Sequence, residues 1–435
     1  MTKDEGQIPS FLPSNHPIFV FYTTNQVIFC PYFHTLKLKQ QMISYREAQQ
    51  IIISHANSFG TETIDLNDAD GRVLAEDIFA DRDYPPFNRS AMDGYAIRFE
   101  DWEKGIRNFE IQEVIFAGKM PDKELKSASA FKIMTGAAVP FPANTVIRKE
   151  DAVESGNIVS FNTEIVKEFK NIARKGEDLK KGSLAVPAKT VCRPAVISTL
   201  ATVGKSRIKV ESLPKVALFT TGNEVKGLDE EISQVEIRNS NYYMLKSLLK
   251  EWNISPAIYR HLNDDNLELK NNIESALKSD IIILSGGVSA GDADFVPEVL
   301  EKLGVQKLFH KIAIKPGKPI WCGKKNQGPM VFALPGNPFS SFVTFKLFID
   351  IFLKKSIGLE TNTIFQSTFK GKKEKKTAFD EFFPVKFCDN GEKIEATRLN
   401  GSGDIRLGID ADALAIHPAE VDLISEGQLI RYYIL

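Results

Sequence analysis

The sequence predicts a multidomain fold of the α/β plus β class, with a central doubly wound parallel-sheet domain, two smaller β domains and a helical/linker domain. From Lys215, strands alternate with helices over about 140 residues, which is typical of a parallel sheet covered by helices on both faces. Short strands of alternating apolar and polar residues fill 97–180 and 377–435, as in small β domains. The length of 435 residues is sufficient for roughly two to four such domains.

The composition indicates an ordinary globular protein. The net charge is −1, so no basic footprint favours a nucleic-acid partner. No stretch approaches about 18 uninterrupted apolar residues, so we expect no membrane span. The 4 cysteines form no CxxC pair and the 6 histidines show no metal-ligand spacing, which favours neither a zinc site nor a disulfide framework. We therefore expect a reducing, cytoplasmic location, and any metal should be a hard ion bound by oxygen.

Residues 1–41 differ in character from the rest of the chain. Prolines and polar residues interrupt their apolar run, and their charges do not have the order of a signal peptide. We expect an extension that is poorly ordered, or a start codon assigned too early. From Met42 the pattern becomes amphipathic, with Ser44 as N-cap and Glu47 three residues later, which predicts a helix with a capping box.

The rest of the chain divides into four expected domains. They are the helical/linker domain (42–80 with 182–212), the first β domain (81–181), the α/β domain (213–359) and the last β domain (360–435). We expect the helical stretch 191–204 to pack back on the opening helix, so that the first β domain is an insertion. The lysine-rich stretch 370–376, KGKKEKK, predicts a solvated linker or turn rather than a binding patch.

A glycine turn follows the most apolar strand of the α/β domain. Residues 281–284 predict a buried parallel strand, and Gly286 and Gly287 come directly after it, before a helix. Unpaired backbone N–H groups at such a turn bind anions. Asp292 and Asp294 in the same loop favour a divalent cation that bridges carboxylate and phosphate. The alternative is an ordinary strand-to-helix turn with an aspartate as N-cap.

A lysine-rich turn is expected at the same edge of the sheet, because sites of doubly wound domains lie beyond the carboxyl ends of the strands. Lys311, Lys315 and Lys318 lie within eight positions, the last two separated by Pro-Gly. Three ammonium groups around a constrained turn suit a multiply charged oxyanion. The PGNP turn after a later strand adds the hydroxyls of Ser340 and Ser341 and a helix N-terminus.

Carboxylates are expected beside these cations. Glu224, Asp292 and Asp294 would be repelled by a bound oxyanion unless a cation bridged them. A phosphate, a cation and an oxyanion in one cleft are what a transferase that cleaves a phosphoanhydride requires. The sequence shows no Ser/His or Cys/His nucleophile arrangement, so we expect no covalent enzyme intermediate.

Two further acids lie on loops outside the α/β domain. Asp93 stands beside a glycine in RSAMDGY, and Asp178 ends the segment Gly176-Glu177-Asp178 in a basic stretch. Loops on rigid scaffolds often carry function. On the residues alone, however, an Asp-Gly surface turn explains the first acid and a solvated turn explains the second.

Eight short motifs, in order, resemble the molybdopterin molybdenumtransferase family of the MoeA type, which also includes the E domains of gephyrin and of plant Cnx proteins. The motifs are AMDGYA (91–96), GED (176–178), TGNE (221–224), SN (240–241), GGVSAGDAD (286–294), KPGKP (315–319), LPGNP (334–338) and GSG (401–403). Each motif alone is weak, but their order and spacing are very specific. The resemblance covers Met42 to Leu435 and leaves residues 1–41 unmatched.

The resemblance implies a homodimer in which adenylylated molybdopterin and molybdate react to give molybdenum cofactor and AMP, with a divalent cation, usually Mg²⁺. It implies as partners the adenylyltransferase that makes the substrate and the maturation proteins of molybdoenzymes. The implied catalytic residues are Asp93, Asp178, Glu224, Asp294, Lys311 and Lys315. The implied substrate-binding residues are Gly286, Gly287, Ser289, Asp292, Lys318, Gly336, Asn337, Ser340 and Ser402, and the metal ligands are Glu224, Asp292 and Asp294.

The sequence departs from the family pattern at the proposed cation and molybdate sites. Asn223 and Asn239 stand where the family commonly has aspartate, which removes negative charge near the cation. Many members also carry an arginine shortly after a Glu-Phe pair in the last domain, whereas Glu381-Phe382 is followed here by Phe383 and Pro384. If that arginine helps to hold molybdate, Lys386 or Arg398 must substitute for it, or molybdate binds more weakly.

Two other functions compete with this interpretation. A molybdopterin adenylyltransferase shares a domain of the 215–355 type, but it would lack the AMDGY and GED segments and the last β domain. A non-catalytic scaffold that binds a receptor peptide, as gephyrin does, would be expected to carry a fused module or a long linker, and neither is evident here.

Overall fold

The computed structural model describes residues 42–435 except 289–294, 362–363, 376 and 407. The chain divides into two units, Met1–Gln41 and Met42–Leu435, and the elements below all belong to the second. Asp292, Asp294 and Ser289 therefore lie outside the described residues. In the described part of the chain, no helix is both long and apolar enough to cross a membrane.

The central sheet has six strands in the order β16-β13-β17-β21-β20-β18. Their bounds are β13 (Val216–Thr221), β16 (Ile258–Leu262), β17 (Ile281–Ser285), β18 (Val305–His310), β20 (Trp321–Lys325) and β21 (Met330–Leu334). The first four strands in the sheet order are parallel, and β20 runs antiparallel to both of its neighbours. A short turn joins β20 to β21, which an antiparallel pair allows and a parallel pair does not. The fold-class prediction is confirmed, with this one reversed strand as an addition.

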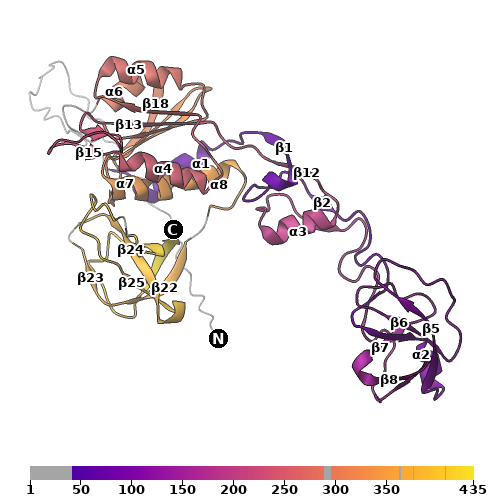
Figure 1. The fold of residues 1–435 in the computed structure, drawn as a ribbon. Helices are drawn as coiled ribbons and strands as arrows, with labels where there is room; N and C mark the ends of the chain where they lie inside the picture. The colour runs from indigo at the N-terminus through magenta and orange to yellow at the C-terminus, as the bar shows by residue number, and fades with distance from the viewer. Residues whose placement is uncertain (1–41, 289–294, 362–363, 376, 407) are drawn as a thin grey trace, which may run out of the picture. The chain divides into compact units, whose positions relative to one another are not determined.

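Helices cover both faces of the sheet. They are α4 (Ser240–Lys250), α5 (Asn266–Ser275), α6 (Val296–Lys302), α7 (Pro338–Thr344), the π-helical turn η3 (Phe345–Ile349) and α8 (Asp350–Ser356). Figure 1 shows α5 and α6 on one face and α4, α7 and α8 on the other. Along β13, Val216 and Leu218 enter one core while Ala217 and Phe219 enter the other. Burial on both faces explains why the central strands β17 and β21 are almost continuously apolar.

Helix α1 (Tyr45–Ser54) begins as predicted, because Ser44 and Glu47 form a capping box. Its buried residues join the core of the α/β domain, where the Tyr45 and Phe382 rings lie 5.2 Å apart between centroids. The Gln49 amide donates to the backbone oxygen of Leu347 in the π-helical turn, at 3.0 Å. The expected packing of 191–204 on this helix is therefore wrong, because the apolar face of α1 covers the α7–α8 helices instead.

Two pairs of strands bring the expected helical/linker segments together. Strand β1 (Thr61–Asp65) pairs antiparallel with β12 (Arg207–Glu211), and β2 (Ile78–Phe79) pairs with β11 (Leu184–Val186). A short 3₁₀ turn, η1 (Leu66–Asp68), and helix α3 (Pro194–Thr202) complete this region. Leu200 and Val203 at the end of α3 pack with Leu74 and Ile78 in a core of their own.

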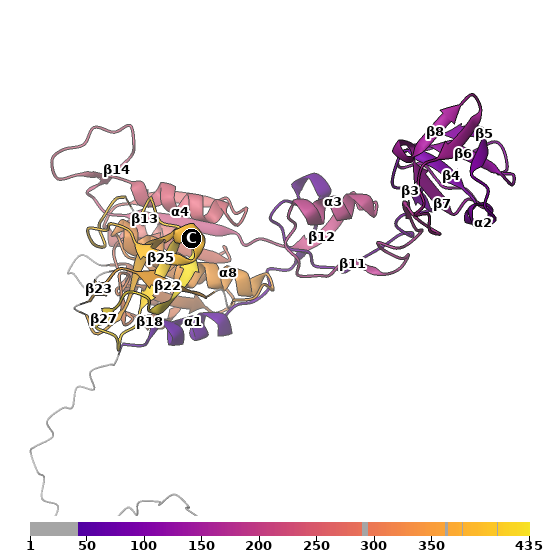
Figure 2. The same cartoon turned by 90° about the horizontal axis from the view of Figure 1, so that it is seen from below.

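The first β domain contains a six-stranded sheet in the order β7-β4-β6-β5-β9-β8. Its elements are β3 (Arg89–Ser90), β4 (Gly94–Ile97), α2 (Phe99–Glu103), β5 (Asn108–Ile115), β6 (Ser129–Ile133), β7 (Thr145–Arg148), η2 (Lys149–Asp151), β8 (Ala152–Ser155), β9 (Ile158–Phe161) and β10 (Ile172–Ala173). Figure 2 shows these strands gathered in one small domain. Tyr95 and Ala96 alternate between the two cores on its faces, which matches the predicted period of two.

The last β domain closes into a barrel-like sheet. Its strands are β22 (Phe365–Lys370), β23 (Lys373–Glu374), β24 (Asp380–Cys388), β25 (Lys393–Ala396), β26 (Ala413–His417), β27 (Leu423–Ile424) and β28 (Leu429–Ile434), with η4 (Asp389–Gly391) between β24 and β25. Strand β24 pairs with both β25 and β26, which closes the sheet. The short strand β19 (Ile314–Lys315) adds in parallel to β24 and sets Lys315 opposite Glu381.

The lysine-rich stretch 370–376 does not behave as a solvated linker, and that prediction is wrong. Lys373 and Glu374 form β23, which pairs with Ile424 and Leu423 of β27. Lys375 is only 8% exposed, and its ammonium group donates to the backbone oxygens of Phe379 and Ala419. The stretch is fixed in the domain because β27 supplies a backbone partner for β23.

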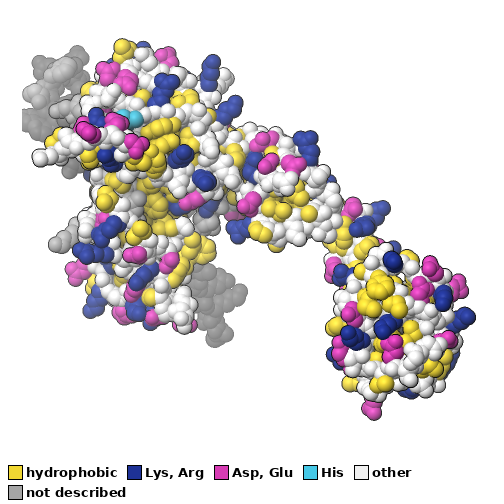
Figure 3. Space-filling view, viewed as in Figure 1, with side chains coloured by type: hydrophobic (Ala, Val, Ile, Leu, Met, Phe, Trp, Pro, Cys, Tyr) yellow, Lys and Arg dark blue, Asp and Glu magenta, His cyan; other side chains and the backbone are white. Residues whose placement is uncertain are grey.

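The surface carries both signs of charge. Figure 3 shows Lys and Arg side chains interspersed with Asp and Glu over the face in view, without a basic stripe on the part of the chain that the structure describes. This distribution agrees with the net charge of −1. It gives no support to a nucleic-acid interface on that face.

Candidate functional site

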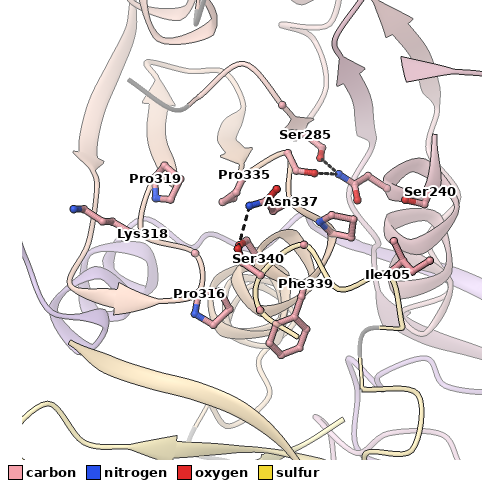
Figure 4. A pocket seen from close by; sticks show the side chains of 18 of the residues that line it. Ser240, Ser285, Pro316, Lys318, Pro319, Pro335, Asn337, Phe339, Ser340 and Ile405 are labelled. Atoms are coloured by element: carbon pink, nitrogen blue, oxygen red, sulfur yellow. Dashed lines mark hydrogen bonds between the residues drawn. The ribbon is translucent and has the colours of Figure 1, made fainter. Parts of the chain in front are cut away.

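One large cavity, of about 1350 Å³, lies at the carboxyl ends of β13, β17 and β21. The last β domain supplies part of its wall, through β24 and the loop that carries Ser402. Figure 4 shows Asn337 between the turn that carries Lys318 and the loop that carries Ile405. Of the predicted site residues, those that line this cavity are Glu224, Gly286, Gly287, Lys315, Lys318, Gly336, Asn337, Ser340 and Ser402.

The glycine turn after β17 lies directly against the end of β13. Gly286 has a φ of +106°, and a Cβ atom there would stand 2.6 Å from Thr221 Oγ1 and 2.7 Å from the Thr221 backbone oxygen. Only glycine fits this position, so the backbone of the turn approaches the cavity without a side chain. Phe295 stands directly before α6 and makes no side-chain cap hydrogen bond. The alternative of an aspartate N-cap concerns Asp292 and Asp294, which lie outside the described residues.

Two asparagine amides connect the segments around the cavity. Asn241 Nδ2 donates to Ser285 Oγ at 2.9 Å and to the Gly336 backbone oxygen at 2.7 Å. Asn337 Nδ2 donates to Ser402 Oγ at 3.1 Å, which connects the PGNP turn to the GSG loop of the last β domain. These bonds hold residues from three distant motifs, and from the end of β17, around one cavity.

The lysine turn faces a carboxylate of the last β domain. Lys315 Nζ donates to Glu381 Oε2 at 3.3 Å, and Lys373 Nζ donates to Glu381 Oε1 at 2.7 Å. Burial would raise the pKa of the Glu381 carboxyl, but Lys373 and then Lys315 hold that pKa below its ordinary value. Lys318 Nζ lies 5.4 Å from the centroid of the Phe379 ring. Lys311 does not line the cavity; its backbone N–H donates to the oxygen of Ile320.

Two further carboxylates, besides Glu381, are those of Glu224 and Asp264, which also line the cavity. Asp264 was not predicted; its backbone N–H donates to Asn223 Oδ1 at 3.1 Å, which holds it near the TGNE motif. Within the described ranges, no group of three or more His, Cys, Asp or Glu side chains could hold a metal ion. Mg²⁺ is often bound by one or two carboxylates together with substrate phosphates, so Glu224 fits such an ion.

Asp93 and Asp178 do not line this cavity. Asp93 lies on the loop between β3 and β4, where Thr135 donates to its Oδ1 from both the backbone N and Oγ1. These two hydrogen bonds lower the pKa of Asp93, so the carboxylate is ionised at neutral pH. Asp178 is exposed, and its backbone N–H donates to the oxygen of Tyr84.

Comparison with known proteins identifies the family. Residues 43–204 match the model of the MoeA N-terminal region (domain I and II), and residues 217–355 match that of the probable molybdopterin binding domain. The molybdopterin molybdenumtransferase of Staphylococcus epidermidis is 31% identical over 404 residues, which are 90% of this chain and 95% of the relative. The chain belongs to the molybdopterin molybdenumtransferase family. The family prediction from the sequence motifs is therefore confirmed.

Further relatives of the molybdopterin molybdenumtransferase family agree with this assignment. The Staphylococcus aureus protein of the same name is 31% identical over 389 residues, covering 87% of this chain and 92% of the relative. The crystal structure of a molybdopterin biosynthesis MoeA protein from Pyrococcus horikoshii OT3 superposes with a TM-score of 0.78 at 28% identity. That alignment covers 91% of this chain and all of the other.

The departures from the family pattern have local explanations. Asn239 is buried, caps α4 by accepting from the Tyr242 backbone N, and donates to Thr220 Oγ1 and to the Tyr259 hydroxyl. Neither expected substitute for the missing arginine lines the cavity. Lys386 forms an ion pair with Glu395 at 3.0 Å. Arg398 is not part of the lining, although its neighbours Thr397 and Leu399 are. The sequence did not single out Lys373 or Thr135. Lys373 pairs with Ile424 and Thr135 donates to Asp93, and both partners are distant in the chain.

Proposed function

We propose that the chain inserts molybdate into adenylylated molybdopterin, which yields molybdenum cofactor and releases AMP. The observation that carries this proposal is the single cavity in which a glycine turn, a lysine turn, the PGNP turn and the Ser402 loop meet. Its volume of about 1350 Å³ accommodates a substrate that contains both a pterin and a nucleotide. Membership of the molybdopterin molybdenumtransferase family supports the same reaction.

Different residues around the cavity bind molybdate and the phosphates of the substrate. Lys315 and Lys318 supply ammonium groups for the oxygens of molybdate, and Ser402 supplies a hydroxyl. The glycine turn at Gly286 and Gly287 presents backbone to the phosphates. A water oxygen attacks the phosphoanhydride of the adenylylated substrate, so that one phosphate stays on the pterin and AMP leaves. Preorganised donors stabilise the charge that develops on the leaving phosphate. No covalent enzyme intermediate is required.

A divalent cation, Mg²⁺, completes the proposal. Glu224 would hold it in the cavity, and Asp292 and Asp294 remain proposed ligands from the glycine loop. When bound, Mg²⁺ neutralises phosphate charge and favours departure of AMP. Glu224→Gln keeps the shape of the side chain and removes its charge, so it should raise the Mg²⁺ concentration required for half-maximal AMP release.

The proposal extends to the assembly and location of the protein. We propose a cytoplasmic homodimer, in which Asp93 and Asp178 serve the cavity of the other subunit. A two-fold dimer allows such sharing, because a site completed across the axis occurs twice. The proposed partners are the adenylyltransferase that supplies the substrate and the maturation proteins that pass the product to molybdoenzymes.

The deciding experiment uses purified protein, adenylylated molybdopterin, molybdate and Mg²⁺. AMP should appear only when molybdate is added, and molybdenum cofactor should form in equal amount. ATP consumption with unmodified molybdopterin would support the adenylyltransferase alternative. Absence of both reactions in a folded protein would favour a non-catalytic scaffold.

A further inference from the structure

The lysine-rich stretch of the last β domain reaches the wall of the cavity. Pairing of β23 with β27 fixes the backbone at Lys373, whose side chain is 20% exposed. Its ammonium group lies 2.7 Å from Glu381 Oε1 and 4.7 Å from the centroid of the Phe383 ring. The side chain is thus held in place on two sides, unlike a lysine on a solvated linker.

Lys373 and Lys315 flank one carboxylate. The β19–β24 pairing sets Lys315 opposite Glu381, and each ammonium group takes a different oxygen of that side chain. Two ammonium groups therefore contact one carboxylate, so the set of Lys315, Lys373 and Glu381 has a net charge of +1. Lys318, over the Phe379 ring, adds a further positive charge to the same wall. A compact ammonium group of this kind is a strong donor to a multiply charged oxyanion.

The lining of the cavity also includes a buried hydroxyl that has no hydrogen-bond partner within the part of the chain that the structure describes. Thr377 lines the cavity, and its Oγ1 finds no hydrogen-bond partner among the described residues. A buried hydroxyl without a partner is unfavourable, so a ligand oxygen that accepts from it would gain the bond that the protein lacks. Lys315 and Lys373 therefore line the cavity on either side of Glu381. Thr377, four positions before Glu381 in the chain, lines the same cavity.

We propose that Lys373 and Thr377 belong to the site that binds a tetrahedral oxyanion, which under the proposed function is molybdate. Lys373 and Lys315 donate to the dianion from two sides, and the Thr377 hydroxyl donates a third bond. Glu381 is a positioning residue that spaces the two ammonium groups before the oxyanion enters. Lys373 then supplies the charge that neither Lys386 nor Arg398 brings to the cavity.

The test measures binding of molybdate, and separately of AMP, by titration calorimetry. Lys373→Met removes the charge and keeps the apolar stem, and Lys372→Met is the matched control at the exposed neighbouring lysine. We expect Lys373→Met to weaken molybdate binding roughly tenfold or more, because one charge-assisted hydrogen bond is lost. Lys372→Met should bind as the unaltered protein does, and Lys373→Arg should recover most of the affinity. Binding of AMP should not change in any of the three.

A second variant keeps the inference testable if Lys373→Met folds poorly. Thr377→Val removes a hydroxyl that has no described protein partner, so thermal stability should stay equal or rise while molybdate affinity falls. Equal molybdate affinity in Lys373→Met and Lys372→Met would overturn the inference, as would a loss of AMP affinity alone, which would assign this wall to the nucleotide phosphate. Both of these results would reject the role of Lys373 only. The proposed function would still hold if the unaltered protein releases AMP on addition of molybdate. Absence of that release would reject the proposed function itself.

Discussion

Thr135 donates two hydrogen bonds to a single oxygen of Asp93, each 2.7 Å long, one from its backbone N and one from its Oγ1. The two residues are 42 positions apart, on loops that flank β4 and β6. The arrangement fixes the direction of the Asp93 carboxylate and lowers its pKa, since both bonds favour the ionised form. An acid in this state acts as a fixed negative charge at neutral pH and not as a proton donor.

We expect Thr135→Val to raise the pKa of Asp93, because it removes the hydroxyl donor and leaves only the backbone bond. The pKa is lowered in the folded protein, so ionised Asp93 stabilises the fold above its unfolded pKa, and this stabilisation is lost as the pH falls through the folded pKa. In Thr135→Val that loss should be smaller, and any acid limb in the pH profile of activity should move upward. NMR titration of the Asp93 carboxyl carbon measures the shift, and Thr135→Ser is the control that restores the hydroxyl.

Lys315→Ala should weaken the response to molybdate without unfolding the protein. The side chain is 54% exposed and supports no core, and Glu381 keeps Lys373 as a partner. Loss of one charge-assisted contact costs on the order of 1.5–3 kcal/mol, which is roughly ten- to hundred-fold in affinity. The molybdate dependence of AMP release measures the effect. If the molybdate dependence of AMP release did not change in Lys315→Ala, the lysine turn would not be part of the molybdate site.

Mixed dimers test whether Asp93 serves the other subunit. The assay uses a molybdate concentration far below the one that Lys315→Ala requires, so that Asp93→Ala and Lys315→Ala are each expected to show almost no activity separately. The two variants are then unfolded and refolded together. If Asp93 acts across the dimer, each mixed dimer has one intact cavity and one with both lesions. Random pairing makes half of the dimers mixed, so about a quarter of the unaltered activity should return.

If Asp93 acts within its own subunit, every cavity keeps one lesion and mixing restores nothing. Exchange of subunits must be verified independently, for example with two distinguishable tags. Verified exchange without recovered activity would reject the shared site and leave the cavity residues of the α/β domain unaffected.

A chain that begins at Met42 should fold, dimerise and retain activity. The capping box at Ser44 starts α1 without help from the preceding residues, and the described unit begins at Met42. A chain that begins at Ala56 is the control, because it lacks α1 and exposes the surface that Ile52 covers. Burial of that one side chain contributes about 1.5–3 kcal/mol. Thermal unfolding and size-exclusion chromatography compare the three chains, and loss of soluble dimer in the Met42 chain would show that residues 1–41 are structural.

Local patterns were sufficient to predict the α/β domain and the position of its cavity. The apolar run at 281–284, the glycines after it and the rule for parallel strands place Gly286, Lys315 and Asn337 at one edge. Contacts between distant segments were not predictable in this way. Lys373 belongs to a run whose composition is that of a linker, and only its pairing with Ile424 turns it toward the cavity. The reversed strand β20 was likewise not predicted, because the direction in which a strand runs leaves no mark in its buried residues, here Trp321 to Gly323.

The core that α1 shares with the central sheet limits how this protein can be divided. This core includes Tyr45 and Ile52 from the start of the described chain, and Phe382 and Tyr433 from its last domain. A fragment restricted to 213–359 would lose these side chains, expose the apolar surface of η3 and α8 that α1 covers, and leave the Leu347 carbonyl without the Gln49 amide. The α/β domain is therefore not an autonomous module. Its transfer into another polypeptide would require a redesigned surface, or the cotransfer of both flanking segments.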